Sequence, residues 1–466
     1  MRPRGQASTD AFEFRLQSPD APNAGSVSLH MQKLVFTRRY VAAFGLLAIA
    51  LALGGIFHFI ARLQPLDEHV PDFVALMLLA GTLYLAGVYL ALRYKGRLPG
   101  LLVILGATVV FRLIFLPLGP RLSEDVYRYQ WEGRVVRAHL NPYTVYPAMH
   151  GLSWARNPGH PIETGKTTPT LYPPVSEVVF SWIHTIAGYK RLFTALDLAT
   201  VALLLVVLSA TNRPLQQVLI YAWNPAVLIA FSLSGHNDSL ALVTLLGATL
   251  LIIGRRGALS IGFLALSALA KLFPVVLLPV FLRRSRWSFS GIFAGVILLG
   301  YLPFLGAGTH LYRGLTDFAA RWEGNDSLFR LLLAAGNSTR QAQLVAAVFL
   351  LFLIAYVLKA RMDVFQASLV VLAGLLLLSS NAFPWYFTWI APFLCFCPSP
   401  ALLLLTVTCV LGYAPVIAYA AGGAFSLSPL MRVLEYLPAF ALLGYEIARY
   451  FQRRHSEERK ELLIGD

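Results

Sequence analysis

Charged side chains are scarce in this sequence. Only 13% of its 466 residues are Asp, Glu, Lys or Arg, and 57% are hydrophobic. A soluble globular protein carries about 25% charged residues. This deficit and the many long apolar runs exclude an ordinary soluble domain, so we predict a polytopic membrane protein.

Cysteine and the familiar soluble motifs are also rare or absent. The three cysteines, Cys395, Cys397 and Cys409, lie in apolar sequence without metal-type spacing to other ligands, so we expect them to pack in the interior. There is no Walker A motif, no Rossmann glycine pattern and no HExxH motif. The first 37 residues lack the apolar core of a signal peptide, and we predict a disordered cytoplasmic tail there.

Acidic residues are outnumbered by basic ones, which gives a formal net charge of +15. Such an excess can indicate binding to nucleic acid. Here, however, the Lys and Arg residues flank apolar runs, as the positive-inside rule describes for membrane proteins. We therefore predict membrane lipids, and no nucleic acid, as partners.

The apolar runs predict an all-α bundle of transmembrane helices. A helix needs about 20 apolar residues to cross a bilayer. The candidate spans are 40–61, 72–92, 99–117, 192–209, 215–233, 238–254, 287–306, 341–358, 363–382, 399–420 and 429–450. Two further segments, 257–282 and 384–398, are interrupted by proline, so we expect about 11 to 13 crossings in total.

The basic clusters predict the orientation of these spans. If all of them are cytoplasmic, both chain termini are cytoplasmic and the long loops 118–191 and 307–340 lie outside. Residues 257–282 then form a re-entrant hairpin with Lys271 near its outer tip. Residues 38–452 become a single transmembrane domain, and 453–466 a second cytoplasmic tail.

This orientation places the unusual polar segments on the same, outer side. They are "RLSEDVYRYQWEGR" (121–134), "SGHNDS" (234–239), "THLYRG" and "RWEGNDS" (within 309–327), and "SNAFPWYFTW" (380–389). A transport pathway would place polar residues at mid-depth. We therefore expect a long, structured outer loop with short interfacial helices that forms a site together with the other segments.

The first of these segments carries the densest cluster of polar and aromatic side chains. Ser123 is a favourable N-cap for a short helix, on which Asp125, Arg128 and Glu132 lie near one face. The acidic residues Glu124 and Asp125 can serve the helix dipole alone, or a carboxylate beside an arginine can stay ionised and act as a base. The nearby cations and rings, Arg128, Tyr129, Trp131 and Arg134, can bind phosphate or stack on a sugar, or form an interfacial belt.

Other candidates come from later in the chain. His236 and Asp238 lie in a "GHND" turn, where turn chemistry and function are both open. Asp197 sits inside an apolar run and serves either function or a helix–helix hydrogen bond. Lys271 either snorkels to the surface or lines a cavity at a proline-broken helix, where its ammonium can hold a lipid phosphate.

Taken together, these motifs resemble the GT-C superfamily of integral-membrane glycosyltransferases, which use polyprenyl-phosphate sugars. "SEDVYRYQWEGRVVRAHLNPY" is similar to the acidic first-loop motif of bacterial polyprenyl-phosphate-mannose-dependent mannosyltransferases and of the enzyme that adds the first mannose to GPI anchors. "WNPAVLIAFSLSGHNDSLAL", "ALAKLFPVVLLP" and "FPWYFTWIAPF" are similar to later blocks of these families. The last block adds Trp385 and Tyr386 to the expected substrate-binding residues.

The resemblance implies an inverting transferase that moves a hexose, with mannose favoured, from a polyprenyl-phosphate donor to a glycolipid, glycan or protein acceptor. Asp125 would be the catalytic base, with Glu124 as its acidic neighbour. Because this pair is adjacent rather than the Asp-x-Asp of some members, the use of a divalent cation (Mg or Mn) stays open. The expected location is a bacterial inner membrane with the site facing the periplasm; the alternative is a lipid-linked sugar transporter or flippase.

Overall fold

The computed structural model describes residues 24–93, 98–120, 122–157, 159–160, 162, 165–416 and 426–464. Within these ranges the chain is helical and has no strand, only two isolated β-bridges. The α-helices are α1 (Ala24–Arg62), α2 (Val70–Arg93), α3 (Leu98–Phe115), α4 (Asp125–Arg137), α5 (Pro174–Ser181), α6 (Ile186–Ala210), α7 (Leu219–Ala222), α8 (Pro225–Leu228), α9 (Asp238–Ile253), α10 (Gly257–Ala270), α11 (Leu278–Arg284), α12 (Ser290–Tyr301), α13 (Arg313–Arg321), α14 (Leu328–Ala334), α15 (Thr339–Lys359), α16 (Val364–Leu378), α17 (Ala391–Leu394), α18 (Pro400–Thr408) and α20 (Pro429–Ile464).

Among the described residues, six helices are long and apolar enough to cross a membrane. They are Val41–Arg62, Val70–Arg93, Leu98–Phe115, Ile186–Ala210, Trp287–Ala320 and Thr339–Lys359. The pair Leu215–Ala222 and Pro225–Leu233 adds a seventh if its 59° bend lies within one span, and four further apolar helices are shorter. The predicted all-α polytopic bundle is confirmed, although several predicted spans are broken helices rather than continuous ones.

Proline explains much of this breakage, since it removes a backbone donor and clashes with the preceding turn. The bend at 215–233 falls where Pro225 follows Asn224, and the segment 384–398 becomes the 3₁₀ turn η7 (Pro384–Trp389) followed by the short helix α17. In the predicted hairpin, α10 ends at Ala270, the backbone of Lys271 is extended, and the 3₁₀ turn η4 (Phe273–Leu277) contains Pro274. The breaks at Lys271 and at η7 place polar side chains beside the start of α9 and beside α5.

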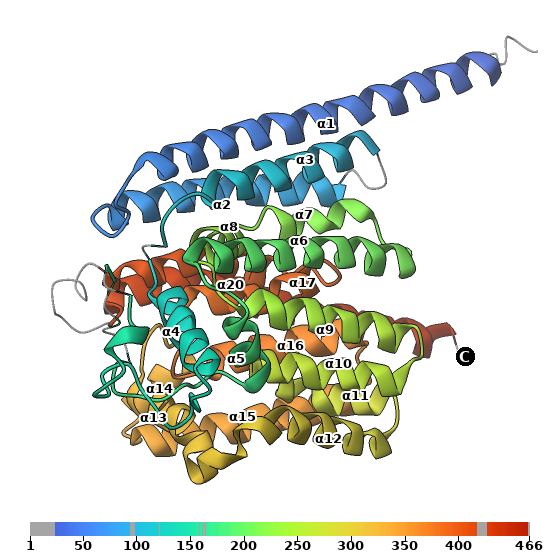
Figure 1. Ribbon diagram of the computed structural model, residues 1–466. Coiled ribbons are helices and arrows are strands. Elements are labelled where there is room, and N and C mark those ends of the chain that lie inside the picture. Colours follow the sequence, from blue (N-terminus) through green and yellow to red (C-terminus); the bar gives the residue numbers. More distant parts are fainter. Residues whose placement is uncertain are drawn as a thin grey trace, which may run out of the picture.

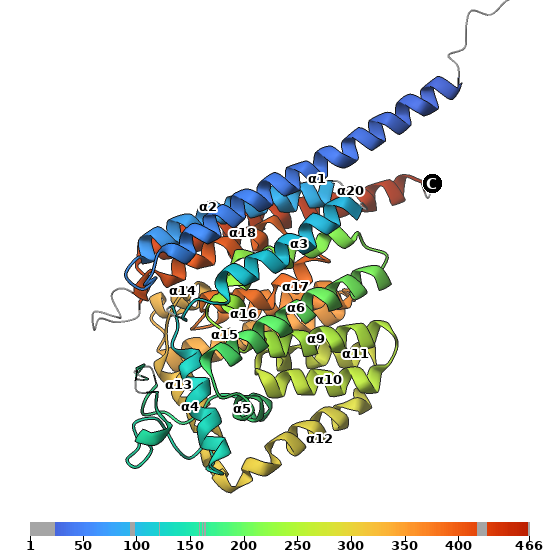
Figure 2. The ribbon, with the colours of Figure 1, turned by 45° about the horizontal axis from the view of Figure 1, so that its top comes forward.

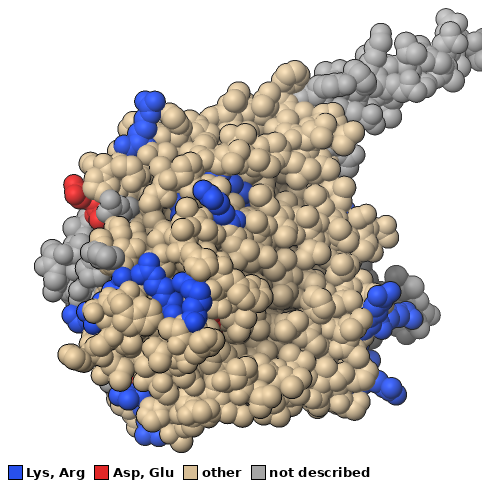
Figure 3. All heavy atoms as spheres, viewed as in Figure 1, with Lys and Arg blue, Asp and Glu red and all other residues tan. Residues whose placement is uncertain are grey.

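The helices pack side by side, and their ends define two faces of the molecule (Figure 1). The beginning of α1 and the end of α20 lie at the same end, while α4, α5, α13 and α14 gather at the opposite end (Figures 1 and 2). Figure 3 shows Lys and Arg side chains over the left part of the molecule and at its right edge. A broad area of surface without charged side chains lies between these two groups. Such a band suits contact with lipid.

Both ends of the described part of the chain are helical. α1 begins at Ala24, inside the segment 1–37 expected to be disordered, and residues 1–23 lie outside the described part of the chain. α20 continues to Ile464, through most of the segment 453–466.

Inside the bundle, Arg112 of α3 forms a buried ion pair with Asp197 of α6. The Nε–Oδ2 distance is 2.6 Å, and neither side chain is more than 1% exposed. Tyr221 also donates to Asp197, at 2.8 Å, and Arg112 donates to the carbonyl of Ala222 at 2.8 Å. Of the two roles open for Asp197, the structure shows the bond between helices.

We expect Arg112→Met to destabilise the protein by about 3–5 kcal/mol, because it leaves the Asp197 carboxylate buried without its cation. The double variant Arg112→Met/Asp197→Leu should recover most of this loss, since no uncompensated charge remains. Thermal unfolding of the detergent-solubilised variants measures both effects. Equal stability of the single and double variants would contradict this account of the pair.

Candidate active site

The helix α4 brings the first candidate carboxylate to the end of the bundle. The helix begins at Asp125, and Glu124 occupies the N-cap position without a side-chain cap bond. The hydroxyl of Ser123 accepts a hydrogen bond from the backbone N–H of Asp125 at 3.2 Å, so it supports the first turn from one residue before the cap. Asp125 therefore stands in the first turn, with its side chain 28% exposed.

Asp125 faces His236, which comes from the turn before α9. His236 Nδ1 lies 3.2 Å from Asp125 Oδ2, and the imidazole has no exposed surface. The turn that carries it needs Gly235, whose φ is +73° and whose missing Cβ leaves room for the side chain of Lys190. On its other side, the His236 ring stacks on Trp385 with a centroid distance of 4.1 Å.

Lys271 forms the cationic half of the same cluster. Its ammonium donates to Asp238 Oδ2 at 2.9 Å and to Asn237 Oδ1 at 3.1 Å. The ring centroids of Tyr172 and Tyr386 lie 5.5 and 5.6 Å from the Lys271 nitrogen, within the range of a cation–π contact. An ammonium has three N–H donors, and among the described residues two of them have acceptors.

A chain of hydrogen bonds connects the elements that carry these groups. The Tyr129 hydroxyl donates to Asn237 Oδ1 at 3.2 Å and lies 3.5 Å from Asp125 Oδ2. Asn237 Nδ2 donates to the Ser176 hydroxyl at 2.9 Å, and Ser176 donates to the carbonyl of Ala270 at 2.7 Å. The chain thus links α4, the start of α9, α5 and the end of α10, directly before Lys271.

An aromatic wall from η7 closes one side of the cluster. Phe383 stacks on Trp385 at 4.6 Å, and Tyr386 stacks on Trp389 at 4.3 Å. Trp389 also donates its indole N–H to Asp238 Oδ1 at 2.7 Å, so it holds the carboxylate that pairs with Lys271. Stacked rings beside charged groups can offer an apolar face to a sugar ring.

The electrostatics of the cluster favour an ionised Asp125. Burial by itself raises the pKa of this carboxyl, but the hydrogen bond and charge of His236 and the charge of Lys271 bring the pKa below its ordinary value. Burial raises the pKa of the Tyr129 and Tyr172 hydroxyls well above their usual value, with a further contribution from Asp125. At neutral pH the site therefore holds a carboxylate base beside neutral phenol groups and a cation.

Most of these side chains belong to the first part of the chain. Residues 39–284 match the model of a known family. The family is MptA/B, described as alpha-(1->6)-mannopyranosyltransferase, N-terminal domain. The chain belongs to the MptA/B family. No curated protein matches it. Because the match covers more than half of the chain, the protein is a membrane-embedded mannosyltransferase.

Membership of the MptA/B family confirms the predicted mannosyltransferase resemblance and favours an enzyme over a transporter. The resemblance to the GPI first-mannose transferase stays a prediction. Within the matched residues lie Asp125, His236 and Lys271. The aromatic wall of this MptA/B chain lies beyond them, and the fold brings it to the same place.

The structure thus brings together many of the predicted site residues of this MptA/B protein. Those in the cluster are Asp125, Tyr129, His236, Asp238, Lys271, Trp385 and Tyr386. Three other predicted site residues, Arg128, Trp131 and Arg134, contact the outer loop or each other. Arg128 donates to the carbonyls of Gly165 and Thr168 and stacks over Trp131, while Arg134 donates to the carbonyls of Ala155 and Arg156.

Sequence reasoning missed four members of the cluster, Tyr172, Ser176, Asn237 and Trp389. Asn237 stands inside the "GHND" turn and Trp389 inside "SNAFPWYFTW". The sequence signal for both was their position beside other candidate site residues. Tyr172 and Ser176 lie in a proline-rich part of the outer loop, "TLYPPVSE", whose contacts depend on tertiary structure.

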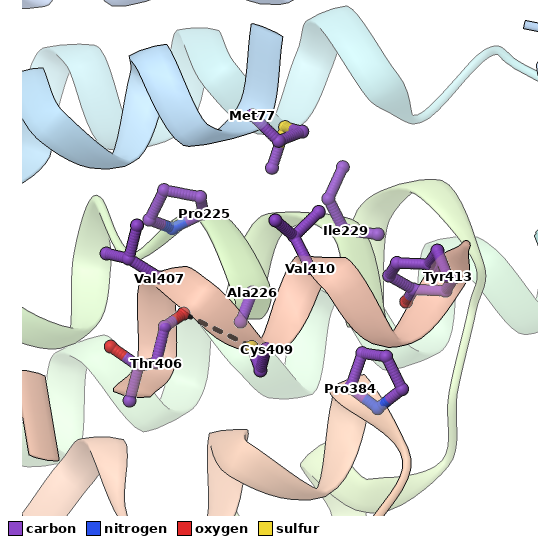
Figure 4. A pocket seen from close by; sticks show the side chains of 10 residues that line it. All are labelled: Met77, Pro225, Ala226, Ile229, Pro384, Thr406, Val407, Cys409, Val410 and Tyr413. Atoms are coloured by element: carbon purple, nitrogen blue, oxygen red, sulfur yellow. Dashed lines mark hydrogen bonds between the residues drawn. The ribbon is translucent and has the colours of Figure 1, made fainter. Parts of the chain in front are cut away.

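An apolar cavity lies beside the aromatic wall of this MptA/B protein. It is small, with a volume of about 10 Å³, and lies between α2, α8, α18 and the 3₁₀ turn η8 (Cys409–Tyr413). Figure 4 shows Met77 of α2 facing Ile229 and Val410 across it, with Pro384 at its edge. Pro384 directly precedes Trp385, so the cavity adjoins η7 without sharing the charged residues.

No group of three or more His, Cys, Asp or Glu side chains within the described residues is placed to hold a metal ion. In the cluster, Asp125 and His236 form a pair, and Lys271 occupies the position beside Asp238.

Proposed function

We propose that this mannosyltransferase takes mannose from a polyprenyl-phosphate donor and transfers it to a hydroxyl of a glycolipid, glycan or protein acceptor. One observation carries this proposal. The carboxylate of Asp125 and the ammonium of Lys271 stand in one cluster, joined through Tyr129 and Asn237. A base and a cation at one site are what a sugar transfer from a phosphate requires.

The proposed reaction is a single displacement. Asp125 accepts the proton of the acceptor hydroxyl, and the oxygen attacks the anomeric carbon of the mannose. The bond between that carbon and the phosphate oxygen breaks, and the electron pair leaves with the polyprenyl phosphate. Lys271 neutralises the negative charge that develops on the leaving phosphate.

The linkage follows from this chemistry and from the family. A single displacement inverts the anomeric configuration, and the family is described as forming an α-(1→6) linkage. The donor would then be a β-linked mannosyl phosphate, and the acceptor hydroxyl the 6-hydroxyl of a sugar. The rings of Trp385 and Tyr386, which lie edge to face beside the cluster, supply a surface on which the sugar can lie.

The proposed location of the reaction is the outer side of a bacterial inner membrane. The cluster belongs to the end of the bundle that carries α4 and α5, and the end of α20 lies at the opposite end (Figure 1). Arg255 and Arg256 follow the end of α9, and Arg283 and Arg284 lie in the last turn of α11, away from α4 (Figure 1). The positive-inside rule then supports cytoplasmic termini and a site that faces the periplasm, within one transmembrane domain over 38–452.

Purified protein in detergent tests this proposal. We expect mannose transfer from a polyprenyl-phosphate mannose to a short α-(1→6)-linked mannoside, and none from GDP-mannose, because the proposed donor is a lipid phosphate rather than a nucleoside diphosphate. Product linkage by NMR tests inversion, and each reaction is run with and without a chelator. Absence of both binding and turnover with every polyprenyl-phosphate sugar tried would overturn the donor assignment.

A further inference from the structure

Two glutamates outside the cluster form a buried acid pair. Glu132 of α4 and Glu177 of α5 have no exposed surface. The two carboxyl groups interact directly, and the buried Oε2 atom of each has no hydrogen-bond donor from any other group among the described residues. Two such carboxyl groups can satisfy each other only if one of them carries a proton.

The neighbours of the pair show which member holds the proton. Arg128 Nε donates to Glu132 Oε1 at 2.7 Å, so Glu132 is the carboxylate. The hydroxyl of Thr170 donates to Glu177 Oε1 at 2.6 Å, which leaves Oε2 of Glu177 to carry the proton. Burial and then the charge of Glu132 raise the pKa of Glu177 well above that of an ordinary glutamate, consistent with this assignment.

The pair fastens a loop segment that reaches the active-site cluster. Arg128 donates its remaining nitrogens to the carbonyls of Gly165 and Thr168, at 2.9 and 2.8 Å. The Thr170 hydroxyl, which donates to Glu177, accepts from the backbone N–H of Tyr172 at 3.0 Å. From the other side, Gly314 of α13 packs so closely that a Cβ there would lie 2.1 Å from the Thr170 carbonyl oxygen.

The segment 165–172 is therefore clamped on both sides, and it ends at the ring beside Lys271. Tyr172 lies 5.5 Å from the Lys271 nitrogen. Ser176, one residue before Glu177 on α5, bonds to Asn237 and to the last carbonyl of α10. A displacement of α5 or of this segment would move two neighbours of the cation together.

We propose that Glu132 and Glu177 are positioning residues of the transferase, and that the proton they share holds Tyr172 and Ser176 in place around Lys271. This inference rests on the proposed function of the cluster. When the shared proton is lost, both buried carboxyl groups carry a negative charge. One arginine, Arg128, contacts Glu132 and the loop. The repulsion between the two carboxylates loosens the segment 165–172, and the catalytic rate falls on the alkaline side.

The other titratable groups that face the pair are few. Arg128 on α4 contributes the positive charge, and Tyr143 and Tyr172 face the pair from the outer loop. Tyr189 faces the acid pair from α6, and the charges of Arg134 and Arg137 also act on Tyr189. Burial raises the pKa of Tyr143 and Tyr172, so these phenols stay neutral while the acid pair titrates.

Substituting Glu177 tests the shared proton directly. In Glu177→Gln the amide N–H₂ donates to Glu132 at every pH, so we expect most of the activity to remain and the alkaline fall to disappear. In Glu177→Leu the carboxylate of Glu132 and the hydroxyl of Thr170 lose their partner, and kcat should fall about 100-fold with a smaller change in KM, as expected for misplaced groups. Glu68→Gln, at an exposed residue of the loop before α2, is the matched control and should behave as the wild type.

Thermal unfolding measured against pH gives a second readout that needs no donor. A raised carboxyl pKa contributes stability that is present at low pH and is lost as the pH rises through it, so the wild type should lose stability on the alkaline side and Glu177→Gln much less. An alkaline fall in activity and stability that is the same in Glu177→Gln and the wild type would overturn the inference. If the wild type turns over no donor, the proposed function fails, while the unfolding profiles still decide the shared proton.

Discussion

Replacing Asp125 with Asn should reduce kcat by about 100- to 10,000-fold, the range typical for loss of a general base. An Asn side chain has nearly the same shape and can still accept from His236, so the cluster should keep its geometry. It cannot take a proton from the acceptor hydroxyl. The mannosyl acceptor then attacks as a neutral hydroxyl, and the chemical step slows while the binding of the donor is retained.

The matched comparison for this variant is Glu124→Gln. Glu124 is the acidic neighbour in the motif, but it occupies the N-cap position, whereas Asp125 contacts His236. We expect a far smaller loss for Glu124→Gln than for Asp125→Asn, measured as kcat and KM with the same donor and acceptor. Near-normal turnover by Asp125→Asn with an unchanged unfolding temperature would remove Asp125 from the role of base.

The pH dependence of the wild type adds an independent check. A base with a lowered pKa is ionised at all pH values above that pKa, and its activity is lost only as the pH falls through it. Because His236 and Lys271 lower the pKa of Asp125, the acidic limb of kcat/KM should lie below the ordinary range of an Asp carboxyl. An acidic limb near neutrality would indicate a different base.

Much of the architecture follows from composition and periodicity. The apolar runs predicted the helices that form α1, α2, α3, α6 and α15, and the prolines predicted the break at Lys271. The span expected at 238–254 is α9, which ends at Ile253, whereas α16 ends at Leu378, before the end of the span expected at 363–382. Apolarity alone does not specify where a helix stops, because capping groups and contacts with neighbouring helices decide it.

The polar segments could be assigned to one side of the membrane from the sequence, but their contacts could not. Arg330 lies 2.9 Å from Asp326, four residues earlier in the chain. Asp326 also pairs with Arg432 of α20 at 3.0 Å, a contact more than a hundred residues apart that no local pattern encodes. In the same way, Arg128 was open between phosphate binding and an ion pair, and only the folded loop shows its three acceptors.

Replacing Lys271 is the second substitution with a large expected effect. In Lys271→Met the cation that faces the leaving phosphate is lost, and kcat should fall about 100- to 1,000-fold, the range for a group that stabilises developing charge. The same change leaves Asp238 buried and without its cation, since Asp238 has no exposed surface and lies 2.9 Å from Lys271 Nζ. Loss of folding therefore competes with loss of chemistry in the single variant.

The double variant Lys271→Met/Asp238→Asn separates these two effects. It removes the buried charge of Asp238, and an amide there can still accept from the indole of Trp389, so stability should return toward that of the wild type. If Lys271 acts on the leaving phosphate, turnover stays low in this stable double variant. If turnover returns with stability, the ammonium only holds Asp238 in place, and the cation that faces the phosphate must be sought elsewhere in the outer loops.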